Sequence, residues 1–189
     1  MPSHAEATAE AAAAAAAVAA SLQPFLVPLK TECVYYKPAL FAEPEAAALF
    51  AELEASLQWE TNSAINRLTA LHGERVGGSA AAAAGGAAAA AEPEYAYKDA
   101  PSMALKEWTA PLLKVKAAVE AWYEANTGRA VSFNVCLANF YQDGQQRIGW
   151  HTDREEIGRT TPIASVSLGA TRKFLLRGMK ERSDAAEVR

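Results

Sequence analysis

The stretch FNVCLANFYQDG (residues 133–144) is the part of the chain that decides the fold prediction. Its odd-numbered positions share one face of an extended strand: Phe133, Val135, Leu137, Asn139 and Tyr141. The last two place polar groups on an otherwise apolar face, which predicts that they point into the domain interior and need partners there. The turn-forming residues 142–145 predict where the strand ends.

Three further motifs follow in a fixed order. They are IGWHTD (residues 148–153), PIASVSLGA (162–170) and RKF (172–174). The apolar runs Pro162–Leu168 and Lys173–Leu176 predict two more strands, so the last third of the chain is rich in strands.

The triplet His151-Thr152-Asp153 is the candidate metal-binding motif. A His-x-Asp triplet is weak evidence by itself, because a partly buried histidine is usually a hydrogen-bonded structural residue. In extended backbone, however, His151 and Asp153 project to the same side and can hold one ion together. Imidazole and carboxylate suit Fe(II), and non-haem Fe(II) oxygenases use two histidines and one carboxylate, which leaves open positions on the metal.

The ordered motifs resemble the catalytic core of the AlkB-like Fe(II)/2-oxoglutarate-dependent dioxygenases, which are nucleic-acid demethylases. The resemblance covers Phe133–Arg177 and, more loosely, Arg67–Thr69 and Tyr95–Tyr97. It implies an α+β fold with a double-stranded β-helix (jelly-roll) core and flanking N-terminal helices, incomplete at the C-terminus. It also implies an enzyme that oxidatively demethylates N-alkylated bases in DNA or RNA, a dealkylation repair.

The cofactors implied are Fe(II) and 2-oxoglutarate, with dioxygen as co-substrate. Oxidative decarboxylation of 2-oxoglutarate then yields succinate and an oxidant that hydroxylates the N-methyl group, which leaves as formaldehyde. The resemblance implies metal binding and catalysis by His151 and Asp153, 2-oxoglutarate binding by Asn139 and Tyr141, and substrate binding by Arg67, Thr69 and Glu155. Two alternatives stay open: Asn139 and Tyr141 bonded only to neighbouring backbone, and Arg67 as a solvated surface charge.

The sequence departs from the family pattern at two points. Arg154 follows Asp153 where relatives commonly carry an acidic residue, and it would have to turn outward to a phosphate to tolerate a cationic base. The family's second metal histidine and its Arg for the 2-oxoglutarate carboxylate follow the Arg-x-Phe strand. The only other histidines here are His4 and His72, so we expect a C-terminally truncated chain.

The rest of the chain predicts its organisation. Residues 1–31 are expected to be a disordered Ala-rich tail, and 32–189 a partial dioxygenase domain with a flexible Gly/Ala insertion at 77–91. Helices are predicted from Pro44 to about Trp59 and from about Thr109 to Gly128. Short strands are predicted at Cys33–Tyr36, Ile65–Leu71 and Tyr95–Lys98.

Composition limits the function classes. A net charge of -4 argues against nucleic-acid binding through a general positive field, so contacts with alkylated DNA or RNA would be local. Cys33 and Cys136 have no paired spacing, which indicates neither disulfides nor a zinc site. We expect an intracellular monomer that does not enter a membrane, in the nucleus or cytoplasm, with an organelle left open.

Two competing functions remain at this point. The first is a catalytically silent, truncated binding or interaction protein, because two metal ligands hold iron weakly. The second is a hydroxylase of a substrate other than DNA, such as protein or an RNA wobble base. Release of succinate would exclude the silent binding protein. The kind of substrate that is oxidised would distinguish a nucleic-acid demethylase from a hydroxylase of another substrate.

Overall fold

The computed structural model describes residues 4–31, 33–62, 65–74, 103–152 and 162–189. The chain divides into two compact units. The first unit comprises Met1–Phe50, Ala117–Val131 and Ala164–Arg189, and the second comprises Ala51–Lys116 and Ser132–Ile163. Helices and antiparallel sheets occur together, which agrees with the α+β part of the predicted fold class.

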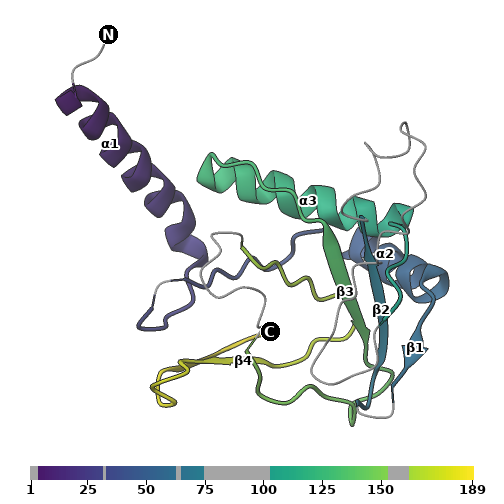
Figure 1. The fold of residues 1–189 in the computed structure, drawn as a ribbon. Helices are drawn as coiled ribbons and strands as arrows, with labels where there is room; N and C mark the ends of the chain where they lie inside the picture. Colours follow the sequence, from purple (N-terminus) through teal and green to yellow (C-terminus); the bar gives the residue numbers. More distant parts are fainter. Residues whose placement is uncertain (1–3, 32, 63–64, 75–102, 153–161) are drawn as a thin grey trace, which may run out of the picture. The chain divides into compact units, whose positions relative to one another are not determined.

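A three-stranded antiparallel sheet lies in the second unit. Its order is β1 (Glu60–Thr61), β2 (Leu68–Gly73) and β3 (Val135–Phe140), with β2 in the centre (Figure 1). The pairing of β2 with β3 runs from Leu68 opposite Phe140 to Gly73 opposite Val135. The strand predicted from residue 133 onward is therefore confirmed, and the one predicted to begin at Ile65 begins three residues later.

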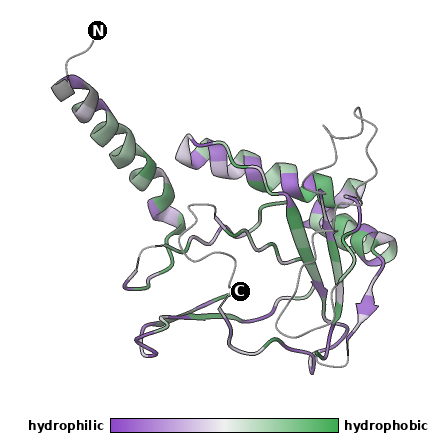
Figure 2. Cartoon of the chain, in the orientation of Figure 1, coloured by the Kyte–Doolittle hydropathy of each residue, from purple (hydrophilic) through white to green (hydrophobic). Residues whose placement is uncertain are grey.

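One face of this sheet is packed against residues of the helix Ala110–Thr127 and of the end of the helix Glu43–Ser56 and the residue after it. Ala70 of β2 is fully buried together with Leu57 and Leu112, and Cys136 and Ala138 of β3 pack against this cluster. The rings of Trp59 and Phe140 lie 5.3 Å apart between centroids and extend the same apolar layer. Figure 2 shows the apolar colouring that runs along β2 and β3. We call this side of the sheet the helix-packed face.

Helices α2 (Glu43–Ser56) and α3 (Ala110–Thr127) form where the sequence predicts them. Both carry a proline in the first turn, where its missing N–H costs no intrahelical bond. Helix α3 ends at Thr127, and the next residue, Gly128, has a φ of +65°, which is easily adopted only without a Cβ. Thr127 also donates its hydroxyl to the carbonyl of Tyr123 at 2.7 Å, which satisfies one of the last carbonyls of the helix.

The N-terminal segment differs from the disordered tail that its composition predicts. The structure has helix α1 (His4–Leu22) followed by a short 3-10 turn, Gln23–Phe25. Alanine has the highest helix propensity of all residues, so a helix can form here although most of its side chains are exposed. Its C-terminal end is buried at Leu22, and Phe25 packs edge-on against Trp122 with centroids 5.3 Å apart.

The C-terminal part of the first unit is a hairpin of β4 (Phe174–Arg177) and β5 (Ala185–Val188). Strand β4 confirms the strand predicted at Lys173–Leu176, whereas β5 was not predicted. The strand predicted at Pro162–Leu168 is wrong, because its backbone is irregular and Ile163 is 62% exposed. The strand predicted at Cys33–Tyr36 is wrong too, since it is reduced to a single bridge between Leu26 and Tyr35.

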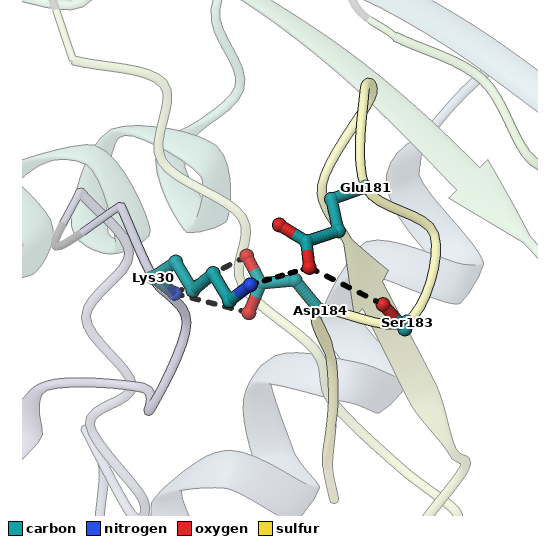
Figure 3. Close-up of polar contacts among 4 residues, drawn as sticks. All are labelled: Lys30, Glu181, Ser183 and Asp184. Carbon is teal, nitrogen blue, oxygen red and sulfur yellow. Dashed lines mark hydrogen bonds and ion pairs between the residues drawn. The ribbon is translucent and has the colours of Figure 1, made fainter.

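Polar contacts attach this hairpin to the segment around Lys30 (Figure 3). The backbone N–H of Lys30 donates to both carboxylate oxygens of Asp184, at 3.0 and 3.2 Å. The ammonium group of Lys30 pairs with Glu181, which also accepts a hydrogen bond from Ser183 at 3.5 Å. The hydroxyl of Tyr36 donates to the carbonyl of Arg189. Among the described helices, no stretch is both long and apolar enough to cross a membrane.

Candidate active site

The second face of the β2–β3 pair carries the predicted cosubstrate and substrate residues. Thr69 lies directly opposite Asn139 in the ladder, and Leu71 lies opposite Leu137. Opposite residues of an antiparallel pair share a face, and side chains alternate along each strand. These four residues therefore lie on the side away from Ala70. We call it the site face.

Arg67 and Asn139 are joined on this face by a hydrogen bond. The Nε–H of Arg67 donates to Oδ1 of Asn139 at 2.5 Å. Arg67 is only 5% exposed, so the alternative of a solvated surface charge is wrong. Thr69 is buried beside it at 3% exposure. The structure thus brings together two residues that the sequence analysis assigned to different ligands.

Asn139 is exposed, whereas the sequence analysis expected it in the interior; Tyr141, which directly follows β3, is half-buried. The expectation for Asn139 rested on strand alternation, which separates the two faces but does not say how deeply each one is covered. The alternative in which Asn139 is bonded only to neighbouring backbone is wrong too, because its side chain is bonded to Arg67. Its shortest hydrogen bond is to Arg67, and its contact with the Leu137 carbonyl is a long 3.5 Å.

His151 follows β3 after a tight turn and is exposed. The predicted turn is confirmed, because the carboxylate of Asp143 accepts the backbone N–H groups of Gln145 and Gln146 at 2.8 and 3.0 Å. Nδ1 of His151 lies 2.8 Å from the carbonyl oxygen of Gly149. A carbonyl can only accept, so Nδ1 carries a proton in this contact.

A second link ties the histidine-bearing segment to the residue before Arg67. The backbone N–H of Arg147 donates to Oδ1 of Asn66 at 3.3 Å. Neither this link nor the Arg67–Asn139 bond was predicted from the sequence. Arg67, Thr69 and Leu71 are two residues apart, which indicates a shared face. The pairing register with β3 was needed to identify Asn139 as the partner of Arg67.

His72 lies on the helix-packed face. Its Cα partner is Cys136, and its Nδ1–H donates to the carbonyl of Glu107 at 2.6 Å. The imidazole is 3% exposed, and among the described residues its Nε2 has no hydrogen-bond partner. A histidine on this face points away from Asn139, so it is badly placed to supply a ligand to the site face. Burial raises the pKa of the neighbouring Cys136 thiol, which keeps it protonated and unreactive.

The remaining predicted site residues lie outside the described residues. These are Asp153 and Glu155, together with Arg154, the Gly/Ala insertion at 77–91 and the strand expected at Tyr95–Lys98. Within the described ranges, no cluster of three or more His, Cys, Asp or Glu side chains is arranged to hold a metal ion. His151 is thus the only predicted metal ligand whose position the structure gives.

Comparison with known proteins places the chain among iron-dependent oxygenases. Residues 33–189 match the family described as the 2OG-Fe(II) oxygenase superfamily. The chain is 33% identical to the DNA oxidative demethylase ALKBH2 of Bos taurus, over 76% of this chain and 48% of that protein. For human ALKBH2 the identity is 31%, over 84% of this chain and 56% of the relative.

A third relative is the alpha-ketoglutarate-dependent dioxygenase alkB homolog 3 of Bos taurus. It is 31% identical, over 70% of this chain and 41% of its own length. The chain therefore spans about half the length of the curated relatives it matches.

Proposed function

The chain belongs to the 2OG-Fe(II) oxygenase superfamily, and from this premise we propose that it acts in the oxidative dealkylation of N-alkylated bases in DNA or RNA. The observation that supports this function most is the site face. It gathers Arg67, Thr69 and Asn139 on one side of the β2–β3 strand pair. The names of the relatives, which include DNA oxidative demethylases, support the same substrate class.

The family implies Fe(II) and 2-oxoglutarate as cofactors and a jelly-roll core. The two antiparallel sheets, β1–β2–β3 and β4–β5, support a jelly-roll. The contact of His151 supports iron binding, because Nδ1 donates to the carbonyl of Gly149 and Nε2 is then the nitrogen that would bind the metal. The donor set of Arg67 and Asn139 supports an acidic cosubstrate, since both can donate to a carboxylate.

In this mechanism each predicted site residue has a defined task. His151 and Asp153 would hold the iron, which when bound supplies oxidation of the N-alkyl group with 2-oxoglutarate and dioxygen. Asn139 and Tyr141 would bind and orient the 2-oxo acid. Arg67, Thr69 and Glu155 would contact the target nucleotide, which must leave the base stack to reach a site on a protein sheet.

A formaldehyde assay tests the function. The 189-residue chain is incubated with Fe(II), 2-oxoglutarate and one of three substrates of matched concentration: N-methylated DNA, N-methylated RNA or an N-methylated peptide. We expect slow release of formaldehyde with a nucleic acid, because the chain supplies only His151 and Asp153 as predicted metal ligands, and none with the peptide. The matched control is His151→Ala, which removes an exposed imidazole and should abolish formaldehyde while leaving the thermal unfolding temperature unchanged.

Succinate measured in the same reactions separates catalysis from the binding-protein alternative. Succinate formed by the wild-type chain and lost in His151→Ala would exclude a catalytically silent protein. Formaldehyde from the peptide alone would instead favour the hydroxylase of a non-nucleic-acid substrate.

We further propose that the protein is an intracellular monomer of the nucleus or cytoplasm. Its two cysteines support a reducing compartment, since Cys33 and Cys136 are both free. Size-exclusion chromatography with light scattering tests the monomer, and fluorescence microscopy of the tagged chain tests the compartment.

A further inference from the structure

The turn that follows β3 is stabilised by its own polar side chains. The carboxylate of Asp143 accepts the backbone N–H groups of Gln145 and Gln146, at 2.8 and 3.0 Å. The side-chain carbonyl of Gln146 in turn accepts the backbone N–H of Gln142 at 2.7 Å. Bonds of this kind fix the path of a turn, because each one ties a side chain to the backbone a few residues away. The chain therefore leaves this turn in a defined direction.

Beyond the turn, one hydrogen bond ties the chain to a distant part of the second unit. The backbone N–H of Arg147 donates to Oδ1 of Asn66 at 3.3 Å. Asn66 directly precedes the buried Arg67, and the segment before it is shaped by a bond from the N–H of Ile65 to the carbonyl of Asn62 at 3.1 Å. Asn66 and Arg147 are 81 positions apart in sequence. Their bond, unlike those within the turn, sets where the turn lies relative to β2.

His151 lies four residues beyond Arg147, on the segment that this bond holds. The contact of its Nδ1 with the carbonyl oxygen of Gly149, at 2.8 Å, orients the imidazole ring within the segment. That contact does not place the segment relative to β2, whereas the bond to Asn66 does. Because His151 is exposed, packing contributes little to its position, which depends on the polar contacts of its own segment.

We propose that Asn66 is a positioning residue for His151, and that its side-chain carbonyl holds the segment that carries the imidazole at a fixed place beside β2. The inference rests on the proposed function, in which His151 binds the metal. A ligand that is held in place beforehand does not have to be ordered on binding, so the affinity for the metal rises. Asn66 acts only through the backbone of Arg147 and touches neither metal nor substrate in this role.

Metal affinity measured without turnover tests this role. The 189-residue chain is titrated with Co(II), a divalent probe for the Fe(II) site, by calorimetry and by visible absorption. We expect Asn66→Ala to bind Co(II) about three- to tenfold more weakly than the wild type, which corresponds to the loss of one ordinary hydrogen bond. Asn66→Asp should bind no more than about twofold more weakly, because its carboxylate can accept the same N–H. His151→Ala should lose the binding.

Hydrogen exchange of the Arg147 backbone amide measures the bond itself. Its exchange should become at least about threefold faster in Asn66→Ala and stay slow in Asn66→Asp. The matched control is Gln145→Ala, which shortens an exposed side chain of the same turn and keeps the backbone N–H bond to Asp143. In this control, the Co(II) affinity and the exchange of Arg147 should both stay within about twofold of the wild type.

The outcomes separate this inference from the proposed function. If the wild type binds Co(II) through His151 and Asn66→Ala binds it equally well, the inference is wrong and the proposed function stands. The inference is also wrong if Asn66→Asp binds as weakly as Asn66→Ala, or if the exchange of Arg147 is the same in all variants. If the wild type does not bind Co(II), or binds it equally well after His151→Ala, both the inference and the metal-binding role of His151 fail.

Discussion

The β2–β3 pair and the β4–β5 hairpin are both antiparallel ladders, yet they are held in place by different forces. Residues Thr69–Gly73 of β2 are all buried, and Leu71 is 0% exposed. In the hairpin, Phe174 and Leu175 are 46% and 50% exposed, and polar contacts with Lys30 attach the loop between its strands. The first ladder is stabilised mainly by apolar burial and the second mainly by its backbone bonds and exposed polar contacts.

This difference explains where precise chemistry can be supported. The hydrogen bond between Arg67 and Asn139 joins a buried residue directly before β2 to β3, a mostly half-buried strand whose six residues all pair with β2. An exposed ion pair such as Lys30 with Glu181 gives much weaker positioning, because solvent and salt screen it. Ligand-orienting residues are therefore better placed on the β2–β3 pair.

The largest expected effect comes from removing a buried apolar side chain of the site face. Leu71→Ala should lower the free energy of unfolding by about 2–5 kcal/mol, since a cavity replaces a fully buried side chain. The matched control is Leu175→Ala on β4, where the leucine is 50% exposed and the change should stay within about 0.5 kcal/mol. Urea unfolding followed by tryptophan fluorescence measures both. Equal losses would contradict the comparison of the two ladders.

A smaller effect is expected from the polar attachment of the hairpin. Asp184→Ala removes the acceptor of the Lys30 backbone N–H and should lower the free energy of unfolding by about 1 kcal/mol. Lys30→Met keeps that backbone bond and removes only the exposed pair with Glu181, so its effect should be below about 0.5 kcal/mol. At about 1 M salt the charges of an exposed pair are screened, so only the effect of Lys30→Met should vanish.

The smallest expected effect concerns the two thiols. Burial raises the pKa of Cys136, whereas Cys33 is exposed. The thiolate is the reactive form, so Cys136 should react with a disulfide reagent at least about tenfold more slowly than Cys33. Because the folded pKa of Cys136 lies above its unfolded value, stability falls as the pH rises from the unfolded pKa to the folded one. Similar reaction rates of the two thiols in the native chain would show that the reagent reaches Cys136 on the helix-packed face.

The sequence predicts elements whose signals are local. Helices α2 and α3 follow from apolar spacing and their N-terminal prolines, and β3 and its turn follow from strand alternation and Asp143. The strand expected at Pro162–Leu168 fails for a physical reason. A strand forms only where a neighbouring strand takes its backbone hydrogen bonds, and an apolar run does not indicate whether such a neighbour is present.

The candidate site was predictable in its residue types but not in its contacts. The motifs indicate Asn139 and His151, and the structure then gives the contact of the His151 ring with Gly149. The bond between Arg67 and Asn139 depends on the register of two strands 72 residues apart in sequence, which no local pattern specifies. Helix α1 agrees with the high helix propensity of alanine, which the notion of a low-complexity tail does not take into account.

Chemical-shift mapping with 2-oxoglutarate tests most directly whether the β2–β3 pair carries the cosubstrate site. Two-dimensional ¹H–¹⁵N spectra of the 189-residue chain are recorded during a titration with 2-oxoglutarate. The account predicts the largest shifts for the Asn139 side-chain amide, the Arg67 Nε–H and the backbone amides of β2 and β3. Shifts confined to β4 and β5, or no shifts in β2 and β3 at saturation, would contradict it.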